Sequence, residues 1–528
     1  MQNAVRLAEM ENGGVKAMEA SEAVGMRLGL GGNKTLTIGE KDLVLFDLDG
    51  RNHKKSSSGK ASSGKQLLED LSCFNCLPGR AADGKGKHTI PLYNVLWAEL
   101  RGDALVVDYA APRKSSLQLK KWTFAIPAAE AETGGPSPET FVSALISAAY
   151  GEAKPRKRAY VLINPNSGPG AALGKWKKQV KPLFDAARME LDVVNLSRGG
   201  EATELSEKAD IQRYDTIMAL SGDGTPNEIF NGLGRRPDAA RALATIAVSH
   251  IPCGSGNAFS LNCNGSNDAA TAALAVVKGV VMPLDLVSIT QGDRRILSFL
   301  SQSLGIIAES DLATENLRWM GGTRFEVGIV TRVLKKKCYP FDLSVKLEID
   351  GKEMIKQHYK KYATDSSLLN VDAEAEAGGA EGLPRLKYGT VHDEIPGDWE
   401  TASYDNVGTF YVGNMAYMSP DANFFTAAVP TDGLMDLVMI NADISVMAVT
   451  KAFLSVESGK FFDNPNVVYK KVSAYRITPR NQDSGYISVD GERIPFEPFQ
   501  AEIHRGLGRV LSKKGVYEAE GPAGWEKA

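Results

Sequence analysis

Three short glycine-rich segments carry the residues of this chain that could bind phosphate or move a proton. They are LINPNSGPG (162–170), ALSGDGTPNEIFNGL (219–233) and IPCGSGNAFS (251–260). Each follows an apolar run typical of a buried strand and precedes a segment with helical spacing. Glycines let backbone N–H groups approach phosphate oxygens, and the start of a helix favours negative charge. Each segment therefore indicates either an anion-binding turn or an ordinary strand-to-helix turn of similar composition.

The second segment also contains a carboxylate. Asp223 stands between Gly222 and Gly224 at the predicted carboxyl end of a strand, which is where ligands bind in open α/β sheets. A carboxylate between glycines is open to a ligand and could accept a proton from a substrate hydroxyl. The alternative is a simple Asp-Gly turn, but the coincidence of strand, turn and helix favours a functional role.

Three such turns in one sheet are more specific than any single one, because the carboxyl ends of parallel strands meet at one edge. Together they predict a nucleotide site. None is a P-loop, since no Gly-Lys-Ser/Thr follows, and none has the G-x-G-x-x-G pattern of a dinucleotide site.

Two later segments contain further charged residues. In 301–325, Asp311, Glu315 and Arg318 share one face of a predicted helix, and Arg324 follows a Gly-Gly break. The arginines could clamp phosphate oxygens, or the face could be a surface salt-bridge ladder. SVDGERIPF (488–496) has the Asp-Gly pattern of a hairpin turn.

The elements that must position these residues form two predicted domains. Strands and helices alternate from 155 to 284, which predicts an α/β domain with a mostly parallel, nucleotide-binding sheet. Residues 285–510 are strand-dominated and predict an antiparallel β-sandwich, with helices near 311–337 and 445–460.

The remaining segments are peripheral. Residues 35–150 predict a small β-rich N-terminal extension with a basic, Ser/Gly-rich linker. Residues 1–34 and an acidic insert at 364–402 are expected to be disordered, because they are poor in apolar periodicity. Residues 511–528 are expected to be a tail.

Composition narrows the class of protein. The 528 residues carry a formal net charge of -3, so no bulk basicity indicates nucleic acid as a partner. Five cysteines in a chain of this length do not suggest a disulfide framework, and a reducing cytosol fits better. No apolar run reaches the roughly 18 residues of a membrane span. We therefore expect a cytoplasmic protein that does not span a bilayer.

Taken in order, these segments resemble the diacylglycerol-kinase catalytic superfamily, and within it most closely the sphingosine (long-chain base) kinases, fungal ones included. The resemblance covers roughly 155–510. It is carried by five stretches: Asn164 to Gly168, Ser221 to Gly224, Gly254 to Asn257, Arg318 to Gly321 with Arg324, and Asp490 to Glu492.

The resemblance implies a cleft between a nucleotide domain and a lipid domain, in which Asp223 is the general base on the primary hydroxyl of a sphingoid base. ATP is the implied phosphate donor, with Mg²⁺ bridging its phosphate oxygens and no dedicated protein metal site. Ser197 belongs to the implied nucleotide contacts, although Glu201 stands where the family usually has histidine. The other implied contacts are Asn164, Asn166, Ser221, Gly222, Gly224, Glu228, Gly254, Ser255, Gly256, Arg318, Arg324, Asp490 and Glu492.

The resemblance also bears on the lipid. Asp311 matches a carboxylate that recognises the substrate ammonium, and Ser301 matches a nearby polar position; Asp311 could equally cap its helix. Kinases of diacylglycerol or ceramide, an NAD kinase and a catalytically inactive lipid-binding scaffold remain alternatives. Cys73 and Cys76 are either ordinary thiols or S-acylation sites for a peripheral membrane attachment. The oligomeric state is left open.

Overall fold

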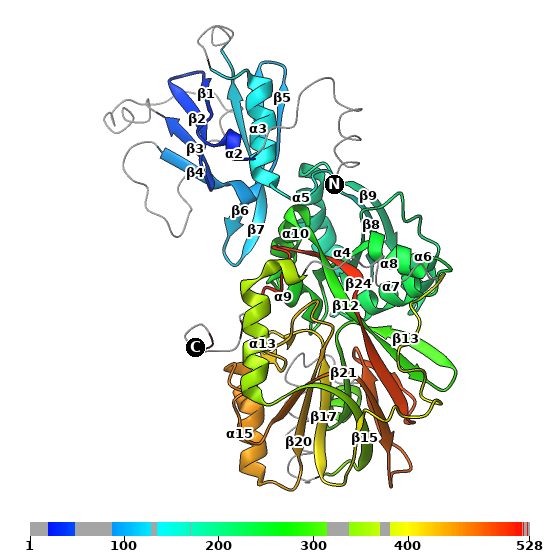
Figure 1. The fold of residues 1–528 in the computed structure, drawn as a ribbon. Coiled ribbons are helices and arrows are strands. Elements are labelled where there is room, and N and C mark those ends of the chain that lie inside the picture. Colours follow the sequence, from blue (N-terminus) through cyan, green and yellow to red (C-terminus); the bar gives the residue numbers. More distant parts are fainter. Residues whose placement is uncertain are drawn as a thin grey trace. The chain divides into compact units, whose positions relative to one another are not determined.

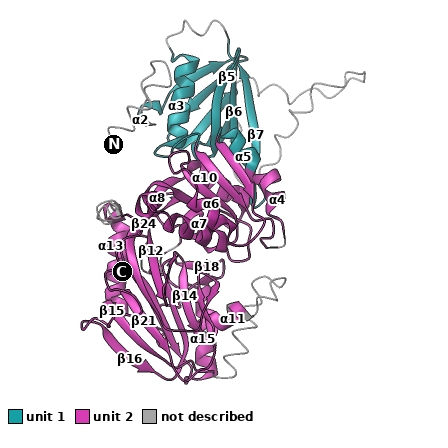
Figure 2. Cartoon of the chain, turned by 90° about the vertical axis from the view of Figure 1, so that its right-hand side faces the viewer, with its two compact units in different colours: residues 1–156, 181–188 teal, residues 157–180, 189–528 magenta. Residues whose placement is uncertain are grey.

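The computed structural model describes residues 20–47, 87–127, 135–168, 170–313, 337–369, 381–519, 521 and 525. The chain divides into two compact units, one formed by residues 1–156 and 181–188 and the other by 157–180 and 189–528 (Figure 2). Within the described parts of the chain, no helix is both long and apolar enough to cross a bilayer.

The first unit contains two antiparallel sheets. The four-stranded sheet is formed by β1 (Arg27–Leu30), β2 (Lys34–Ile38), β3 (Asp42–Asp47) and β4 (Lys87–Pro91). The three-stranded sheet is formed by β5 (Val95–Arg101), β6 (Ala104–Arg113) and β7 (Ser116–Ala125). Short helical pieces accompany them: α2 (Ala20–Ala23), η2 (Leu92–Asn94) and α5 (Lys181–Ala186).

The first unit also contains the helix α3 (Pro138–Tyr150). It begins where the side chain of Ser137 accepts a hydrogen bond from the Thr140 N–H, with proline in the first turn. At its other end, the Tyr150 hydroxyl donates to the Leu96 carbonyl over 2.7 Å. This bond attaches α3 to β5 and fixes the helix against the three-stranded sheet.

The expectation that residues 1–34 are disordered is wrong for the described part of that range. Strand β1 pairs with β2 in antiparallel register, with Leu28 opposite Leu36. Leu28 and Leu30 alternate along the strand and are buried. Two leucines at strand spacing suffice to order β1 because the partner strand supplies the rest of the hydrophobic surface.

The second unit begins with the predicted parallel strands. They are β8 (Arg158–Ile163), β9 (Glu190–Asn195), β10 (Thr216–Ser221) and β11 (Ala247–Pro252), in the order β9-β8-β10-β11. Helical segments connect them: α4 (Ala172–Lys175), η4 (Trp176–Val180), α6 (Glu201–Glu207), α7 (Gly224–Gly234), α8 (Ala239–Thr245), α9 (Ala258–Asn264) and α10 (Ala269–Lys278). The α/β architecture is thus confirmed.

Strand β24 (Phe499–Ser512) joins this sheet to the C-terminal β-sandwich (Figure 1). Its last residues pair with β11 in parallel, its first residues pair with β21 (Val468–Pro479), and β12 (Val280–Gln291) runs antiparallel beside it. The two predicted sheets are therefore one mixed sheet of 15 strands among the described residues. Its other members are β13 (Arg294–Ser298), β14 (Ser301–Gly305), β15 (Phe341–Asp350), β16 (Glu400–Tyr404), β17 (Val407–Gly413), β20 (Met435–Asn441), β22 (Ile487–Val489) and β23 (Glu492–Ile494).

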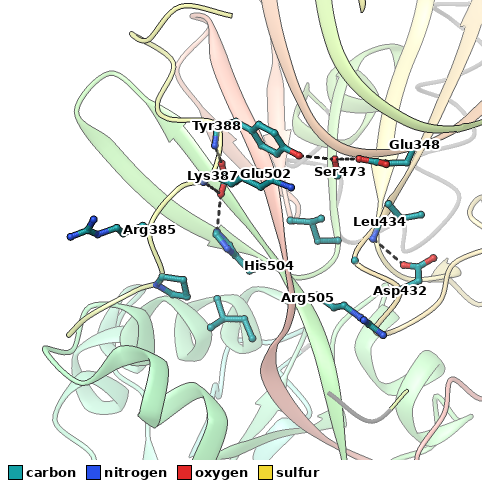
Figure 3. A pocket seen from close by; sticks show the side chains of 14 residues that line it. Glu348, Arg385, Lys387, Tyr388, Asp432, Leu434, Ser473, Glu502, His504 and Arg505 are labelled. Atoms are coloured by element: carbon teal, nitrogen blue, oxygen red, sulfur yellow. Dashed lines mark hydrogen bonds and ion pairs between the residues drawn. The ribbon is translucent and has the colours of Figure 1, made fainter. Parts of the chain in front are cut away.

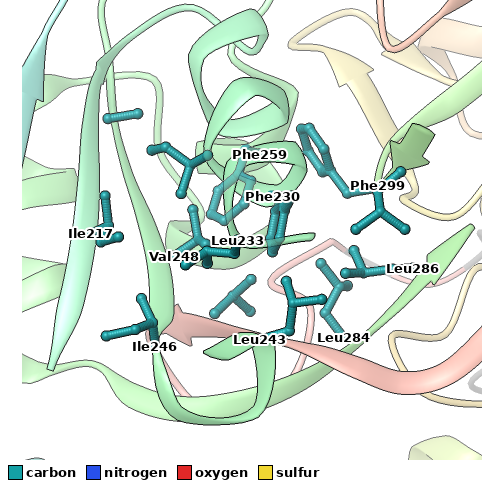
Figure 4. Packing of buried hydrophobic residues seen from close by; sticks show 14 of the residues in the cluster. Ile217, Phe230, Leu233, Leu243, Ile246, Val248, Phe259, Leu284, Leu286 and Phe299 are labelled. Atoms are coloured by element: carbon teal, nitrogen blue, oxygen red, sulfur yellow. The ribbon is translucent and has the colours of Figure 1, made fainter. Parts of the chain in front are cut away.

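The hydrophobic core is also continuous between the α/β part and the sandwich (Figure 4). Phe230 of α7 and Phe259 of α9 both pack on Phe299, which lies between β13 and β14, with ring centroids 5.5 Å apart in each pair. All three rings are buried. Since α7 and α9 follow two of the glycine-rich turns, this packing fixes those turns relative to the sandwich.

Part of the predicted disordered insert is ordered. Residues 381–402 are hydrogen-bonded to strand β24. The N–H groups of Lys387 and Tyr388 donate to the Glu502 carboxylate. The Gln500 side chain donates to the carbonyls of Tyr388 and Gly389. The composition of the insert did not reveal this, because the stabilising side chains belong to β24. Residues 370–380 lie outside the described residues.

Helix α15 (Val446–Glu457) confirms the helix predicted near 445–460. Helix α11 (Ile306–Ala313) overlaps only the start of the helix predicted near 311–337, and most of that range lies outside the described residues. Helix α13 (Lys352–Thr364) was not predicted. The segment is rich in lysine and has few apolar residues, and Ile355 is its buried residue.

Candidate functional site

The three glycine-rich turns meet at one edge of the sheet, because β8, β10 and β11 are adjacent and parallel. Direct hydrogen bonds link the turns. The Gly222 N–H donates to Ser167 Oγ over 3.2 Å, and the Cys253 N–H donates to the Ser221 carbonyl over 2.8 Å. The turns therefore form one connected surface rather than three separate loops.

Two glycines are required by close backbone approach. A Cβ on Gly254 would lie 2.6 Å from the Cα of Gly222, and a Cβ on Gly168 would lie 2.5 Å from the Cys253 carbonyl oxygen. Gly168 also has a φ of +56°, a conformation that glycine adopts without strain. Larger residues at these positions would force the turns apart.

Asp223 follows β10 directly and stands before α7. Its carboxylate accepts hydrogen bonds from the N–H groups of Ala258 and Phe259, at 2.9 and 3.0 Å, in the first turn of α9. A Cβ on Gly256 would lie 3.3 Å from Asp223 Oδ2. The carboxylate is thus half-buried, oriented by two backbone donors and bordered by the third glycine-rich turn.

His250 lies beneath this turn and was not predicted. Its Nε2 is 2.9 Å from the Ser221 carbonyl oxygen, so Nε2 carries the proton and donates it. Complete burial lowers the pKa of His250, although the nearby Asp223 acts in the opposite direction. A neutral imidazole therefore supports the backbone just before Asp223.

The predicted nucleotide residues of the three turns differ in exposure. Asn164 is half-buried and its Oδ1 accepts from the Asn166 N–H, whereas Asn166 and Ser255 are exposed. Ser221 is buried and its hydroxyl donates to the Gly222 carbonyl. Its side chain thus shapes the turn.

Asn257 belongs to a stretch that carries the resemblance but was not among the predicted site residues. Its side chain accepts from the Gly254 N–H over 2.8 Å and donates to the Gly254 carbonyl over 2.9 Å. Its φ is +59°, which asparagine tolerates better than most residues. The Gly-x-Gly-Asn pattern was the available signal, since asparagine commonly closes such turns.

Glu228 of α7 and Ser197 of the loop after β9 both form hydrogen bonds at the start of α6. Glu228 accepts from the N–H groups of Gly200 and Ala202, each at 3.1 Å. Ser197 donates its N–H and its hydroxyl to Glu201, and these two bonds lower the pKa of Glu201. Both predicted contacts therefore hold the loop between β9 and α6 in place.

Asp490 and Glu492 stand at either side of the turn between β22 and β23. Asp490 is buried and both its oxygens accept hydrogen bonds from the protein. Burial raises its pKa, and these hydrogen bonds oppose that shift. Glu492 is exposed, and its Oε1 lies 3.3 Å from the place that a Cβ on Gly224 would occupy. Glu492 thus faces the turn that contains Asp223.

The predicted lipid-recognition residues are only partly within the described structure. Ser301 begins β14, is buried, and lies 3.4 Å from the Tyr411 hydroxyl. Asp311 belongs to α11, which follows β14 directly, and its side chain lies outside the described residues. So do four further predicted residues: Arg318, Arg324, Cys73 and Cys76.

A polar cavity of about 380 Å³ lies elsewhere in this unit (Figure 3). It is formed by β24 residues around His504, by the ordered insert at Arg385 and Lys387, and by Asp432. None of the described residues predicted for catalysis lines it. Among all the residues that the structure describes, no group of three or more His, Cys, Asp or Glu side chains is placed to hold a metal.

Three family models match the chain. A domain of unknown function matches residues 26–151, a diacylglycerol kinase catalytic domain matches 158–289, and a YegS C-terminal NAD kinase beta sandwich-like domain matches 302–512. The last two together span the residues of the glycine-rich turns and of the sandwich.

Similar proteins include two fungal ones. The chain is 34% identical to Sphingoid long chain base kinase 5 of Saccharomyces cerevisiae, over 72% of this chain and 62% of that protein, which is less than two thirds of its length. It is 31% identical to Sphingoid long chain base kinase 4 of Schizosaccharomyces pombe, over 80% of this chain and 88% of that protein. A solved structure of a diacylglycerol kinase from Bacillus anthracis str. Sterne has 17% identity and a TM-score of 0.44, covering 67% of this chain and 97% of that one.

Proposed function

The chain belongs to the family of sphingoid long-chain base kinases, and we propose that it transfers the γ-phosphate of ATP to the primary hydroxyl of a sphingoid base. The observation that carries this proposal is the arrangement around Asp223. Its carboxylate stands at the carboxyl end of β10, between two linked glycine-rich turns, with two backbone N–H groups orienting it. A base in that position can accept the hydroxyl proton as the hydroxyl oxygen attacks phosphorus.

The glycine-rich turns would hold the nucleotide. In this proposal, the half-buried backbone around Gly222, Gly224 and Gly254 lies against the phosphates, where side chains would obstruct the approach. Asn164 stabilises the first turn through the Asn166 N–H, and Glu228 stabilises the start of α6. Arg318 and Arg324 would contribute positive charge to the phosphates.

Mg²⁺ would neutralise charge on the transferring phosphate. It needs few protein ligands when phosphate oxygens supply the others. Glu492, whose Oε1 lies beside Gly224, is the carboxylate best placed to share the ion.

The lipid would approach from a membrane surface. We propose peripheral association, with Cys73 and Cys76 as candidate acylation sites, because a sphingoid base resides in a bilayer and one attached chain anchors a protein only marginally. Asp311 would pair with the substrate ammonium, and Ser301 would contact the polar head group. An ammonium is absent from diacylglycerol and ceramide, so Asp311 is the residue that would discriminate against them.

A lipid panel tests this proposal. Wild type and Asp311→Asn are incubated with ATP and mixed micelles of sphingosine, dihydrosphingosine, diacylglycerol or ceramide. Phosphorylation of the two sphingoid bases, reduced selectively by Asp311→Asn, is the expected result. Turnover of diacylglycerol or ceramide alone would overturn the assignment of substrate, and turnover of no lipid would leave an inactive lipid-binding protein.

A further inference from the structure

Asp490 is the acceptor for an unusually large set of donors. Its buried carboxylate, on a residue 3% exposed, receives five hydrogen bonds. The donors are Ser298 Oγ at 2.6 Å, Asn227 Nδ2 at 2.7 Å, and the N–H groups of Phe299, Leu300 and Ser301 at 3.0, 3.1 and 2.9 Å. Both oxygens of Asp490 are therefore occupied by donors of the protein itself, and neither is open to a nucleotide.

Asn227 connects this carboxylate to α7, one turn after Asp223. Its Nδ2 also donates to the Leu297 carbonyl over 3.2 Å. Asn231, one turn further along α7, donates to the same carbonyl and accepts from the Leu297 N–H, both at 2.9 Å. Two asparagines on one face of α7 are thus hydrogen-bonded to the backbone of Leu297, just before the corner between β13 and β14.

The same carboxylate fixes the hairpin that presents Glu492. Asp490 and Gly491 have φ values of +51° and +83° and form the tight turn between β22 and β23. Asp490 holds this turn against the β13–β14 corner, and Glu492 follows with Oε1 beside Gly224. Strand β14 starts at the same corner and leads into α11.

We propose that Asp490 and Asn227 are positioning residues that keep Glu492 in register with the turn containing Asp223. The hydrogen bonds of Asp490 to Asn227 and to the donors at Ser298–Ser301 form what we call the clamp. Asp490 acts through this clamp rather than by touching ATP. Because the clamp joins α7, the hairpin and β14, it sets the distance between the nucleotide turns and the carboxylate that faces them. This inference rests on the proposed kinase function, because it assigns these residues a role in nucleotide positioning.

The first test variant is Asp490→Asn. Asparagine accepts the positive φ of the turn, so the backbone is preserved. However, one carboxylate oxygen becomes an NH₂ group that faces existing hydrogen-bond donors, so the hydrogen bonds that this oxygen accepted are lost. We expect the KM for ATP to rise about tenfold and kcat to fall, while the KM for the lipid changes much less.

The exchange variant Asn227→Asp/Asp490→Asn supplies a partial rescue. It restores one acceptor and one donor across the 2.7 Å contact with the polarity reversed, but the new amide also faces the Phe299 N–H and the new carboxylate also faces the Leu297 carbonyl. We expect its KM for ATP to lie between those of wild type and Asp490→Asn. Asn227→Ala removes the contact from the helix side and should reproduce the single-variant defect, which keeps the test open if Asp490→Asn does not fold.

Asp285→Asn is the matched control. Asp285 is also a buried carboxylate held by backbone N–H groups, those of Gly433 at 2.7 Å and Gly506 at 2.6 Å. We expect it to lower the unfolding temperature without a selective rise in the KM for ATP. A wild-type KM for ATP in Asp490→Asn and Asn227→Ala, or the same rise in Asp285→Asn, would overturn the positioning role.

ATP affinity measured by calorimetry separates this inference from the proposed function. A wild type that binds no ATP would remove the kinase proposal itself. A wild type that binds ATP, together with an Asp490→Asn protein that binds it equally well, would remove the clamp and leave the kinase proposal standing.

Discussion

Gly222 and Gly254 lie on neighbouring turns, and a Cβ on Gly254 would be 2.6 Å from the Cα of Gly222. No real Cβ tolerates that distance to a backbone atom, so one of the two turns must move when a side chain is added. The N–H of Gly254 also donates to the Ser221 carbonyl, directly before Gly222. The separation of the two glycine-rich turns therefore depends on the absence of a side chain at Gly254.

The Gly254→Ala variant tests this contact. We expect kcat/KM for ATP to fall about 100-fold, because a displacement near 1 Å at a nucleotide site has effects of that size. Gly174→Ala is the control, since a Cβ there meets no atom within 4 Å. Steady-state kinetics with ATP as the varied substrate check the prediction, and wild-type kinetics in Gly254→Ala would contradict the described packing of the turns.

A buried ion cluster stabilises the β-sandwich at Lys471. Its Nζ lies 2.9 Å from Asp432 and 3.1 Å from Asp436, and all three side chains are essentially inaccessible. Burial raises the pKa of Asp436 to about 6 despite Lys471, whereas Lys471 and His358 overcome the burial of Asp432 and lower its pKa. The ionised form of both buried carboxylates is therefore stabilised by the Lys471 ammonium group.

Lys471→Met should lower the free energy of unfolding by about 3–5 kcal/mol, the usual cost of breaking a buried pair. Without the lysine, burial raises the folded-state pKa values of both Asp432 and Asp436 above those of the unfolded chain, so stability is kept at low pH and lost as pH rises through those raised values. Urea unfolding should therefore show a smaller loss at pH 5 than at pH 8.

Lys470→Met is the matched control for that experiment. Lys470 precedes Lys471 on β21 and pairs with Asp350, whose side chain is 59% exposed, over 3.1 Å. A pair of that kind contributes about 0–1 kcal/mol. Equal losses in the two variants would show that Lys471 does not stabilise a buried cluster.

Asp238 should contribute to stability in a defined pH range. The Arg236 side chain, 2.7 Å away, and then Arg241 lower its pKa to about 2. The unfolded chain has an aspartate pKa of about 4, so the contribution is complete above pH 4 and is lost as pH falls towards 2. The difference in unfolding free energy between wild type and Asp238→Asn should therefore shrink between pH 5 and pH 3. A difference that stays constant over this range would refute the ion pairing.

The glycine-rich turns could be predicted from the sequence because their signals are local. An apolar strand, a turn with Asp223 or Gly254 and a helical segment occur within about 20 residues of each other, and parallel strands bring such turns to one edge. The long alternation from 155 to 284 likewise specifies an α/β domain without knowledge of distant contacts.

Features that depend on distant partners could not be predicted. The clamp at Asp490 joins residues separated by 263 positions, with Asn227 as its partner. The ordering of 381–402 depends on Gln500 and Glu502, and the continuity of the sheet depends on the length of β24. In each case the informative residue lies in a different element from the segment that it orders.

The most direct test of the account is the turnover of Asp223→Asn on sphingosine, with ATP affinity measured on the same protein. The account predicts that kcat falls at least 100-fold while ATP still binds, because the variant loses the base and keeps the glycine-rich turns. A variant that binds ATP and retains more than a tenth of wild-type kcat would contradict the assignment of Asp223 as the general base.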